Sequence, residues 1–146
     1  MINKAGKDLI KSYEGLRLTA YKCSANVDTI GYGNTFYEDG TKVKPGDKIS
    51  LDRASKLFDF IIEKFAAKVK ELIKKDVTEN QFAALVSFGY NCGTAALAKS
   101  TLLKKVNANP NDPTIKDEFM KWTKAGGKQL TGLVKRRASE AKLYFS

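Results

Sequence analysis

The segment from Glu14 to Thr35, EGLRLTAYKCSANVDTIGYGNT, constrains the fold more than any other part of this sequence. Residues 16–21 and 27–33 alternate in polarity or are β-branched, and Ser24-Ala25-Asn26 between them has the composition of a turn. The pattern predicts an antiparallel β-hairpin. The segment is therefore expected to belong to a small antiparallel β lobe.

A helix is expected immediately before this hairpin. Apolar residues recur at helical spacing between Asn3 and Tyr13, and Gly15 stands where such a helix would end. The members of this apolar stripe are Ala5, Leu9, Ile10 and Tyr13. Glu14 is therefore predicted at the end of a first helix, directly ahead of the hairpin.

A long amphipathic helix is predicted from about 51 to 74. Its apolar face carries Leu57, Phe58, Ile61, Ile62, Phe65, Val69, Leu72 and Ile73. At 1.5 Å per residue it is about 35 Å long, which is enough to join two lobes. Between the hairpin and this helix, a third short strand is expected near 41–43, after the Glu38-Asp39-Gly40 turn.

Helical patterns dominate the rest of the chain. Thr78 to Gln81 forms a capping box ahead of a helix that Gly93 ends, and further helices are expected at about 95–107, 113–122 and 131–145. Asp112 is the expected cap of the helix at 113–122, with Pro113 at its first position, and Thr131 is the expected cap of the last helix. The prediction is an α+β protein of one domain, residues 1–146, with a β-rich lobe at about 15–50, a connecting helix at about 51–74, and a helical lobe at about 78–146 that includes the N-terminal helix.

The composition favours polyanionic partners without indicating nucleic acid. The chain has 26 Lys and Arg against 16 Asp and Glu, a net charge of +10. Its basic residues are spread along the whole sequence and form no nucleic-acid motif, so no nucleic-acid partner is expected. The N-terminal residues contain no apolar core of signal-peptide length, which predicts synthesis and retention in the cytosol.

Neither a metal nor another cofactor is expected. Histidine is absent, and the two cysteines, Cys23 and Cys92, have no metal-ligand spacing. In a reducing cytosol both are predicted to be free thiols.

The hairpin segment resembles the active-site motif of the phage-type lysozymes, the endolysins that cut bacterial peptidoglycan. The family pattern is a glutamate, eight residues, an aspartate, five residues, and a threonine that opens a TIGYG-like strand; the same spacing here gives Glu14, Cys23 and Thr29. The similarity continues through QFAALVSFGYNCG and through Trp122 followed by GLVKRRASEAKLY. It implies a lysozyme-like fold with a small antiparallel β lobe, a larger helical lobe, a long connecting helix and a cleft between the lobes.

The resemblance implies roles for the three motif residues. Glu14 would be the general acid, since glycoside cleavage needs a carboxylic acid that keeps its proton near neutral pH. Cys23, where the family commonly has aspartate, would be base or nucleophile, or alternatively a small buried apolar residue. An ordinary thiol is only about 3% ionised at pH 7, so catalysis requires a lowered pKa, which neighbouring Lys22 and the positive field would favour. Thr29 would orient a water or bind the sugar.

Residues outside the motif have predicted roles as well. Tyr32, Asn34 and Asn91 are the candidate substrate-binding residues, the last because the FGYNCG segment matches a helix end that lines the family's cleft. Arg136 or Arg137 would either pair with Glu14 or bridge helices. Trp122 is expected in the core, and Asp28 is expected to point away from Thr29 because adjacent strand residues face opposite sides.

The predicted function is that of a phage or prophage endolysin. It would hydrolyse the β-1,4 bond between N-acetylmuramic acid and N-acetylglucosamine and so lyse the host. It would reach the wall through a membrane lesion made by another protein, as a monomer without stable membrane association. Two alternatives stay open: a lytic transglycosylase that uses Glu14 alone, and a catalytically inactive wall-binding module.

Overall fold

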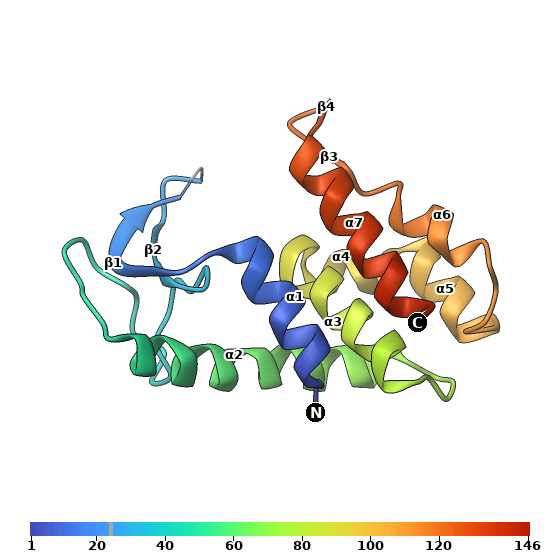
Figure 1. Cartoon of the computed structure of the whole chain (residues 1–146), viewed down its shortest axis with the longest axis horizontal. Coiled ribbons are helices and arrows are strands. Elements are labelled where there is room, and N and C mark those ends of the chain that lie inside the picture. The colour runs from blue at the N-terminus through green and yellow to red at the C-terminus, as the bar shows by residue number, and fades with distance from the viewer. Residues whose placement is uncertain (24) are drawn as a thin grey trace. The chain divides into compact units, whose positions relative to one another are not determined.

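A computed structural model describes residues 1–23 and 25–146, and its internal contacts divide the chain into two compact units. The β unit comprises residues 11–64, and the helical unit comprises residues 1–10 and 65–146. Helices α1 (Lys4–Glu14) and α2 (Leu51–Leu72) each contribute residues to both units (Figure 1). The long helix predicted from the apolar stripe is thus confirmed as α2, with 22 residues.

The β unit is built on the predicted hairpin. Strands β1 (Arg17–Lys22) and β2 (Asp28–Gly31) pair antiparallel, with Tyr21 opposite Thr29 and Lys22 opposite Asp28. Ile30, Val43 and Leu57 form the buried core of this unit. Of the predicted turn, Ser24 lies outside the described residues, whereas Asn26 adopts a left-handed backbone with φ of 60°. Asparagine tolerates this conformation better than most residues, which suits a tight turn.

The third strand expected near 41–43 is reduced to a single bridge between Phe36 and Lys42. The Asp39 carboxylate accepts hydrogen bonds from both the backbone N–H and the hydroxyl of Thr41, at 2.9 and 2.7 Å. This local side-chain turn competes with a β ladder for the same backbone groups. Pro45, which has no N–H to donate, follows soon after.

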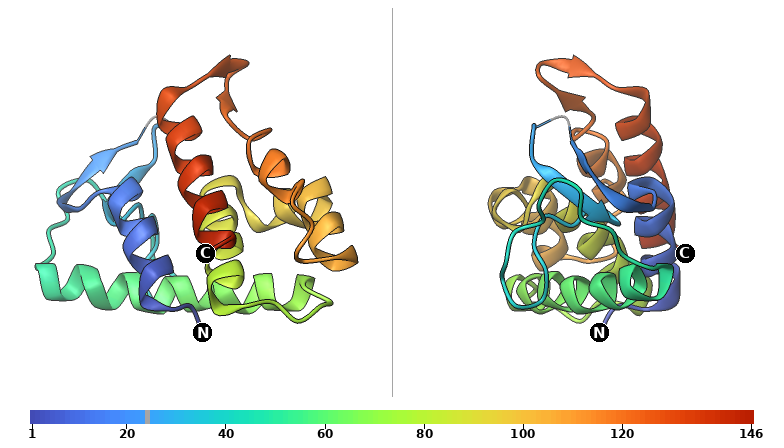
Figure 2. Two further views of the ribbon diagram at one scale, coloured as in Figure 1. Left: turned by 45° about the vertical axis from the view of Figure 1, so that its right-hand side comes forward. Right: turned by 90° about the vertical axis from the view of Figure 1, so that its left-hand side faces the viewer.

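The helical unit is organised around α3 (Glu79–Cys92), in which eight residues are buried. The predicted capping box is confirmed, since Thr78 accepts from the Gln81 N–H while the Gln81 side chain accepts from the Thr78 N–H, and Gly93 caps the other end. Helix α7 (Thr131–Tyr144) packs against α3, and α6 (Ile115–Phe119) packs against α7. Figure 2 shows these helices from two further directions.

Three boundaries in this unit differ from the predictions. The helix expected at 95–107 is two helices, α4 (Thr94–Lys99) and α5 (Thr101–Ala108), because the Ser100 hydroxyl caps α5 by accepting from the Leu103 N–H at 3.0 Å. The helix expected at 113–122 is only α6, because Asp112 binds Thr114 in a local turn. Leu130, and not Thr131, is the N-cap residue of α7.

A second hairpin was absent from the prediction. Strands β3 (Lys124–Ala125) and β4 (Lys128–Gln129) pair antiparallel around Gly126 and Gly127, both with positive φ. A Gly-Gly pair between two short polar runs is a hairpin signal that the sequence does carry. Among the described residues, no helix combines the length and the apolar character that crossing a membrane requires.

Candidate active site

Glu14 lies against the turn that follows strand β2. It is the last residue of α1, and Gly15 ends the helix with a φ of +72°. The Glu14 Oε1 atom lies only 2.8 Å from where a Cβ atom on Gly33 would stand, and Gly33 itself has a φ of +82°. Both residues belong to the β unit, so the tertiary structure of that unit brings the carboxyl group close to the glycine-rich end of strand β2.

Cys23 directly follows strand β1, at the start of the hairpin turn. Its backbone N–H donates a hydrogen bond to the Val27 carbonyl at 3.0 Å. The pKa of Cys23 is lowered from its ordinary value, first by a hydrogen bond from the backbone of Val27, then by one from the Thr29 side chain and one from the backbone of Ala25. Hydrogen bonds of this kind stabilise the thiolate more than the thiol. The shift is in the direction that favours the thiolate, the reactive form of cysteine.

Lys22, which was expected to lower the Cys23 pKa, has another partner. Its ammonium group forms an ion pair with Asp28 at 3.1 Å across the hairpin. The cause of the lowered pKa is thus the hairpin's hydrogen bonds rather than this neighbouring charge. The same ion pair gives Asp28 a partner on the neighbouring strand.

Thr29 connects the cysteine to the strand. It is buried, and its hydroxyl donates to the Val27 carbonyl at 2.9 Å while also lying within hydrogen-bond reach of Cys23. A hydroxyl has one proton and two lone pairs, so the Thr29 oxygen can also accept a hydrogen bond. By rotation about its C–O bond, the Thr29 hydroxyl can direct its O–H either to the Val27 carbonyl or to a Cys23 thiolate.

The two predicted substrate-binding residues of the β unit differ in exposure. The half-buried Tyr32 ring packs edge-on against Phe58 at 5.4 Å, and the Lys11 ammonium group lies 5.1 Å from the Tyr32 ring centre. Asn34 is only 4% exposed and exchanges two backbone hydrogen bonds with Ile30. Burial leaves the Asn34 side chain little surface through which to contact a sugar, so its described role is to hold the strand end.

Asn91, the third predicted substrate-binding residue, lies in the helical unit and is exposed near the end of α3. Its side-chain oxygen accepts a hydrogen bond from Arg137 at 2.8 Å. Arg137 is fully buried and also donates to the Cys92 sulfur at 2.6 Å. With its oxygen engaged in this way, Asn91 presents its amide N–H groups for any further contact.

Arg136 and Arg137 both form ion pairs with Glu140, at 3.4 and 2.6 Å. Glu140 is fully buried, and burial raises its pKa while the two guanidinium groups oppose that rise. Its carboxylate also accepts from the Ser87 hydroxyl at 2.5 Å, which links α7 to α3. Of the two predicted roles for these arginines, the described contacts support helix bridging.

Sequence reasoning missed Glu140, although a signal was present. Glu140 follows Arg136 by four residues and Arg137 by three, the spacings at which helical side chains meet. Trp122 was predicted in the core, and its half-buried ring does pack edge-on against Phe88 at 5.3 Å.

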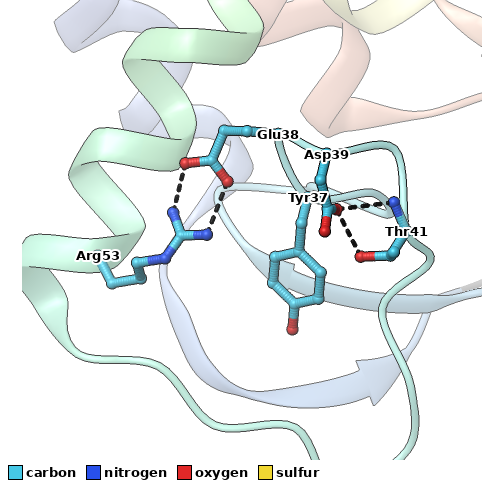
Figure 3. A pocket seen from close by; sticks show the side chains of 5 residues that line it. All are labelled: Tyr37, Glu38, Asp39, Thr41 and Arg53. Carbon is cyan, nitrogen blue, oxygen red and sulfur yellow. Dashed lines mark hydrogen bonds and ion pairs between the residues drawn. The ribbon is translucent and has the colours of Figure 1, made fainter.

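The β unit also has an open pocket of about 500 Å³ that none of the predicted catalytic residues lines (Figure 3). Its walls are Tyr37, Glu38, Asp39, Thr41 and Arg53. Arg53 donates two hydrogen bonds to Glu38, at 2.5 and 2.7 Å, while Asp39 is bound to Thr41. Burial and the nearby Asp47 carboxylate raise the pKa of Tyr37 to about 12. The charged groups that line this pocket are thus engaged in hydrogen bonds with other residues of the pocket wall, and we assign the pocket a structural role.

The sequence profile described as Phage lysozyme matches residues 11–140 of the chain. The chain belongs to the phage lysozyme family. The matched residues include Glu14, Cys23 and Thr29, the three residues of the predicted motif. Both cysteines are free thiols.

Similar proteins support this membership of the phage lysozyme family. The chain is 47% identical to an endolysin of Bacillus phage B103, covering 99% of this chain and 54% of that protein, and 41% identical to an endolysin of Acyrthosiphon pisum secondary endosymbiont phage 1, covering 99% and 98%. A solved endolysin from Escherichia coli O157:H7 phage FAHEc1 superposes with a TM-score of 0.91 at 39% identity, covering 100% of this chain and 94% of that one. The predicted α+β lysozyme-like fold is confirmed. The chain spans about half the length of the endolysins of Bacillus phages B103 and PZA, to which it is 47% and 42% identical.

Proposed function

We propose that this chain is a peptidoglycan hydrolase that cleaves the β-1,4 bond between N-acetylmuramic acid and N-acetylglucosamine. Membership of the phage lysozyme family supports a glycoside hydrolase in general. The observation that supports this particular mechanism most is the set of hydrogen bonds at Cys23 from Val27, Thr29 and Ala25, because they lower its pKa in the direction that a base or nucleophile needs.

In this proposal Glu14 is the general acid that protonates the leaving oxygen. Its carboxyl group is half-buried and held against Gly33, a setting that limits its movement. Cys23 is the base that activates water, or the nucleophile that attacks the sugar. Thr29 orients the attacking water through its hydroxyl oxygen while its O–H donates to Val27, or it turns the O–H toward the thiolate.

The substrate contacts are part of the same proposal. Tyr32 and Asn91 would bind the glycan through a half-exposed ring and through amide N–H groups, whereas Asn34 would act by shaping the strand end beneath. The whole chain would work as a single lysozyme-like domain and as a monomer, without metal or cofactor.

We further propose that it is made in the host cytoplasm and reaches the wall through a membrane lesion made by another protein. The endolysin names of its relatives support the wall as its place of action.

The experiment is product analysis on purified peptidoglycan under reducing conditions. The variants are Glu14→Gln, Cys23→Ala and Cys23→Asp, with Cys92→Ala as a matched control that removes the other thiol. We expect new reducing ends from the wild type, from Cys23→Asp and from Cys92→Ala, and none from Glu14→Gln or Cys23→Ala.

Two other results would replace the proposal. Full activity in Cys23→Ala with anhydro ends and no reducing ends would identify a lytic transglycosylase that relies on Glu14 alone. An inert wild type that still binds the wall, with binding unchanged in Glu14→Gln, would identify a binding module.

A further inference from the structure

The positive charge of this protein is concentrated in one of its two units. The β unit contains nine Lys and Arg and eight Asp and Glu, whereas the helical unit contains 17 Lys and Arg and again eight acidic residues. Nearly all of the net charge of +10 therefore belongs to the helical unit. An electrostatic partner should bind that unit rather than the one that carries the motif.

Within the helical unit, two long stretches are free of acidic residues, 80–111 and 119–139, and the second carries more Lys and Arg. Residues 119–139 contain six Lys and Arg and no Asp or Glu. Two of the six, Arg136 and Arg137, are buried against Glu140, and Lys121 forms an ion pair with Glu118 at 2.9 Å. The remaining three, Lys124, Lys128 and Lys135, are exposed.

The β3–β4 hairpin carries the first two of these lysines to the surface. All residues from 124 to 132 are exposed, and the hairpin extends beyond the first turn of α7 in every view (Figures 1 and 2). Lys124 pairs with Gln129 while Lys128 pairs with Ala125, so the two ammonium groups lie on opposite faces of the ribbon. Among the described side chains, no acidic group forms an ion pair with either lysine.

We propose that the β3–β4 hairpin is a docking element for the phosphodiester polymer of the bacterial wall, a flexible polyol phosphate. The proposal rests on the proposed function, which places the enzyme in the wall. Charge complementarity supports it, because ammonium groups that neutralise phosphates release the polymer's condensed counterions. Lysines on both faces of a narrow ribbon fit a flexible polymer that can bend around the tip, whereas a flat bilayer would meet only one face.

Nucleic acid is the less suitable polyanion. Residues 124–132, KAGGKQLTG, include no aromatic side chain on which bases could stack, and stacking is a main source of affinity for single strands. The hairpin therefore offers phosphate contacts alone. Its lysines would hold the enzyme on the wall between successive cleavages without taking part in the reaction.

The test measures binding of the full chain to soluble poly(glycerol phosphate) at several salt concentrations. The hairpin variant is Lys124→Gln with Lys128→Gln, and the matched control is Lys42→Gln with Lys48→Gln, which removes two exposed lysines from the β unit and lowers the net charge equally. We expect the slope of log affinity against log salt to fall by about 0.7 for each hairpin lysine removed. The control should keep the wild-type slope.

Equal slopes for the two double variants, or no binding by the wild type, would overturn the inference. Two further probes are an oligothymidylate with the same number of phosphates and vesicles of anionic phospholipid; tighter hairpin-dependent binding to either would overturn the assignment to the wall polymer. Hydrolysis of peptidoglycan stripped of its phosphate polymer is measured in parallel, and both double variants should match the wild type. An inert wild type there would contradict the proposed function, whereas an active wild type without hairpin-dependent binding would contradict this inference alone.

Discussion

Gly33, in the turn after strand β2, lies beside the predicted general acid Glu14. Its φ of +82° is in the left-handed region, and a Cβ atom would stand 2.8 Å from the Glu14 Oε1 atom. We expect Gly33→Ala to lower the free energy of unfolding by about 1–2 kcal/mol through backbone strain. Because the added methyl group displaces the carboxyl group as well, lysis activity should fall by about 100-fold.

Gly40→Ala separates strain from displacement. Gly40 has a nearly identical φ of +86°, but nothing lies within 4 Å of the position that its Cβ would occupy. Urea unfolding should report a similar loss of stability for both variants, while lysis assays should report near-normal activity for Gly40→Ala. Equal losses of activity in Gly33→Ala and Gly40→Ala would mean that the close approach of Gly33 to Glu14 does not matter for activity.

The pKa values of the two cysteines should differ from that of an ordinary thiol in opposite directions. Hydrogen bonds from Val27, Thr29 and Ala25 lower the pKa of Cys23, whereas burial raises the pKa of Cys92. The thiolate is the reactive form, so a lower pKa means faster alkylation at a given pH below it. Iodoacetamide alkylation followed against pH should give a lower midpoint for Cys23, measured in Cys92→Ala, than for Cys92, measured in Cys23→Ala.

Thr29→Val tests the origin of the low midpoint. The variant keeps the β-branched shape and removes one hydrogen bond to the sulfur. The midpoint of Cys23 alkylation should move upward in pH. An unchanged midpoint would assign the whole effect to the backbone of the turn.

At the scale of elements, the buried ion cluster joins α7 to α3. Glu140 forms ion pairs with Arg136 and Arg137 and accepts a hydrogen bond from Ser87, and all four residues are buried. Glu140→Gln would leave two buried guanidinium groups without a carboxylate, and we expect a loss of about 3–5 kcal/mol in the free energy of unfolding. Urea denaturation monitored by circular dichroism measures it.

Glu118→Gln is the matched control for this carboxylate. Glu118 is also buried, but its partners Lys105 and Lys121 have side chains 30% and 65% exposed and so can regain water. Glu118→Gln should lower the free energy of unfolding clearly less than Glu140→Gln does. Equal costs would show that the buried pairing adds nothing beyond a surface salt bridge.

Some element boundaries were decided by single hydrogen bonds. The pattern at 95–107 predicted one helix because its apolar spacing is continuous, yet the Ser100 hydroxyl both donates to the Leu97 carbonyl and accepts from the Leu103 N–H, which separates α4 from α5. Serine has nearly the same helix propensity as many interior residues, so propensity could not have found the break. The capping box at Thr78 and Gln81 was found because its two partners are close in sequence.

At the scale of the whole molecule, the net charge of +10 predicts salt-sensitive activity on an anionic wall. Raising the ionic strength from about 0.01 M to about 0.3 M shortens the Debye length from about 30 Å to less than about 10 Å. We expect the lysis rate of intact walls to fall steeply over this range, as measured by turbidity. Hydrolysis of a short uncharged glycan fragment should change little, and an equally steep fall there would point to a salt effect on folding or on the chemistry.

The sequence alone determined the elements that local rules specify and the family that the motif spacing implies. Hairpin, connecting helix and capping box follow from side-chain period and short-range hydrogen bonds, and Glu14, Cys23 and Thr29 follow from their spacing. Only the tertiary structure decided which groups set the pKa of Cys23, that Glu14 lies against Gly33, and that Glu140 is the partner shared by both arginines. The physical reason is that hydrogen bonds, burial and close approach depend on distances between atoms, and a linear pattern does not contain those distances once the chain has turned.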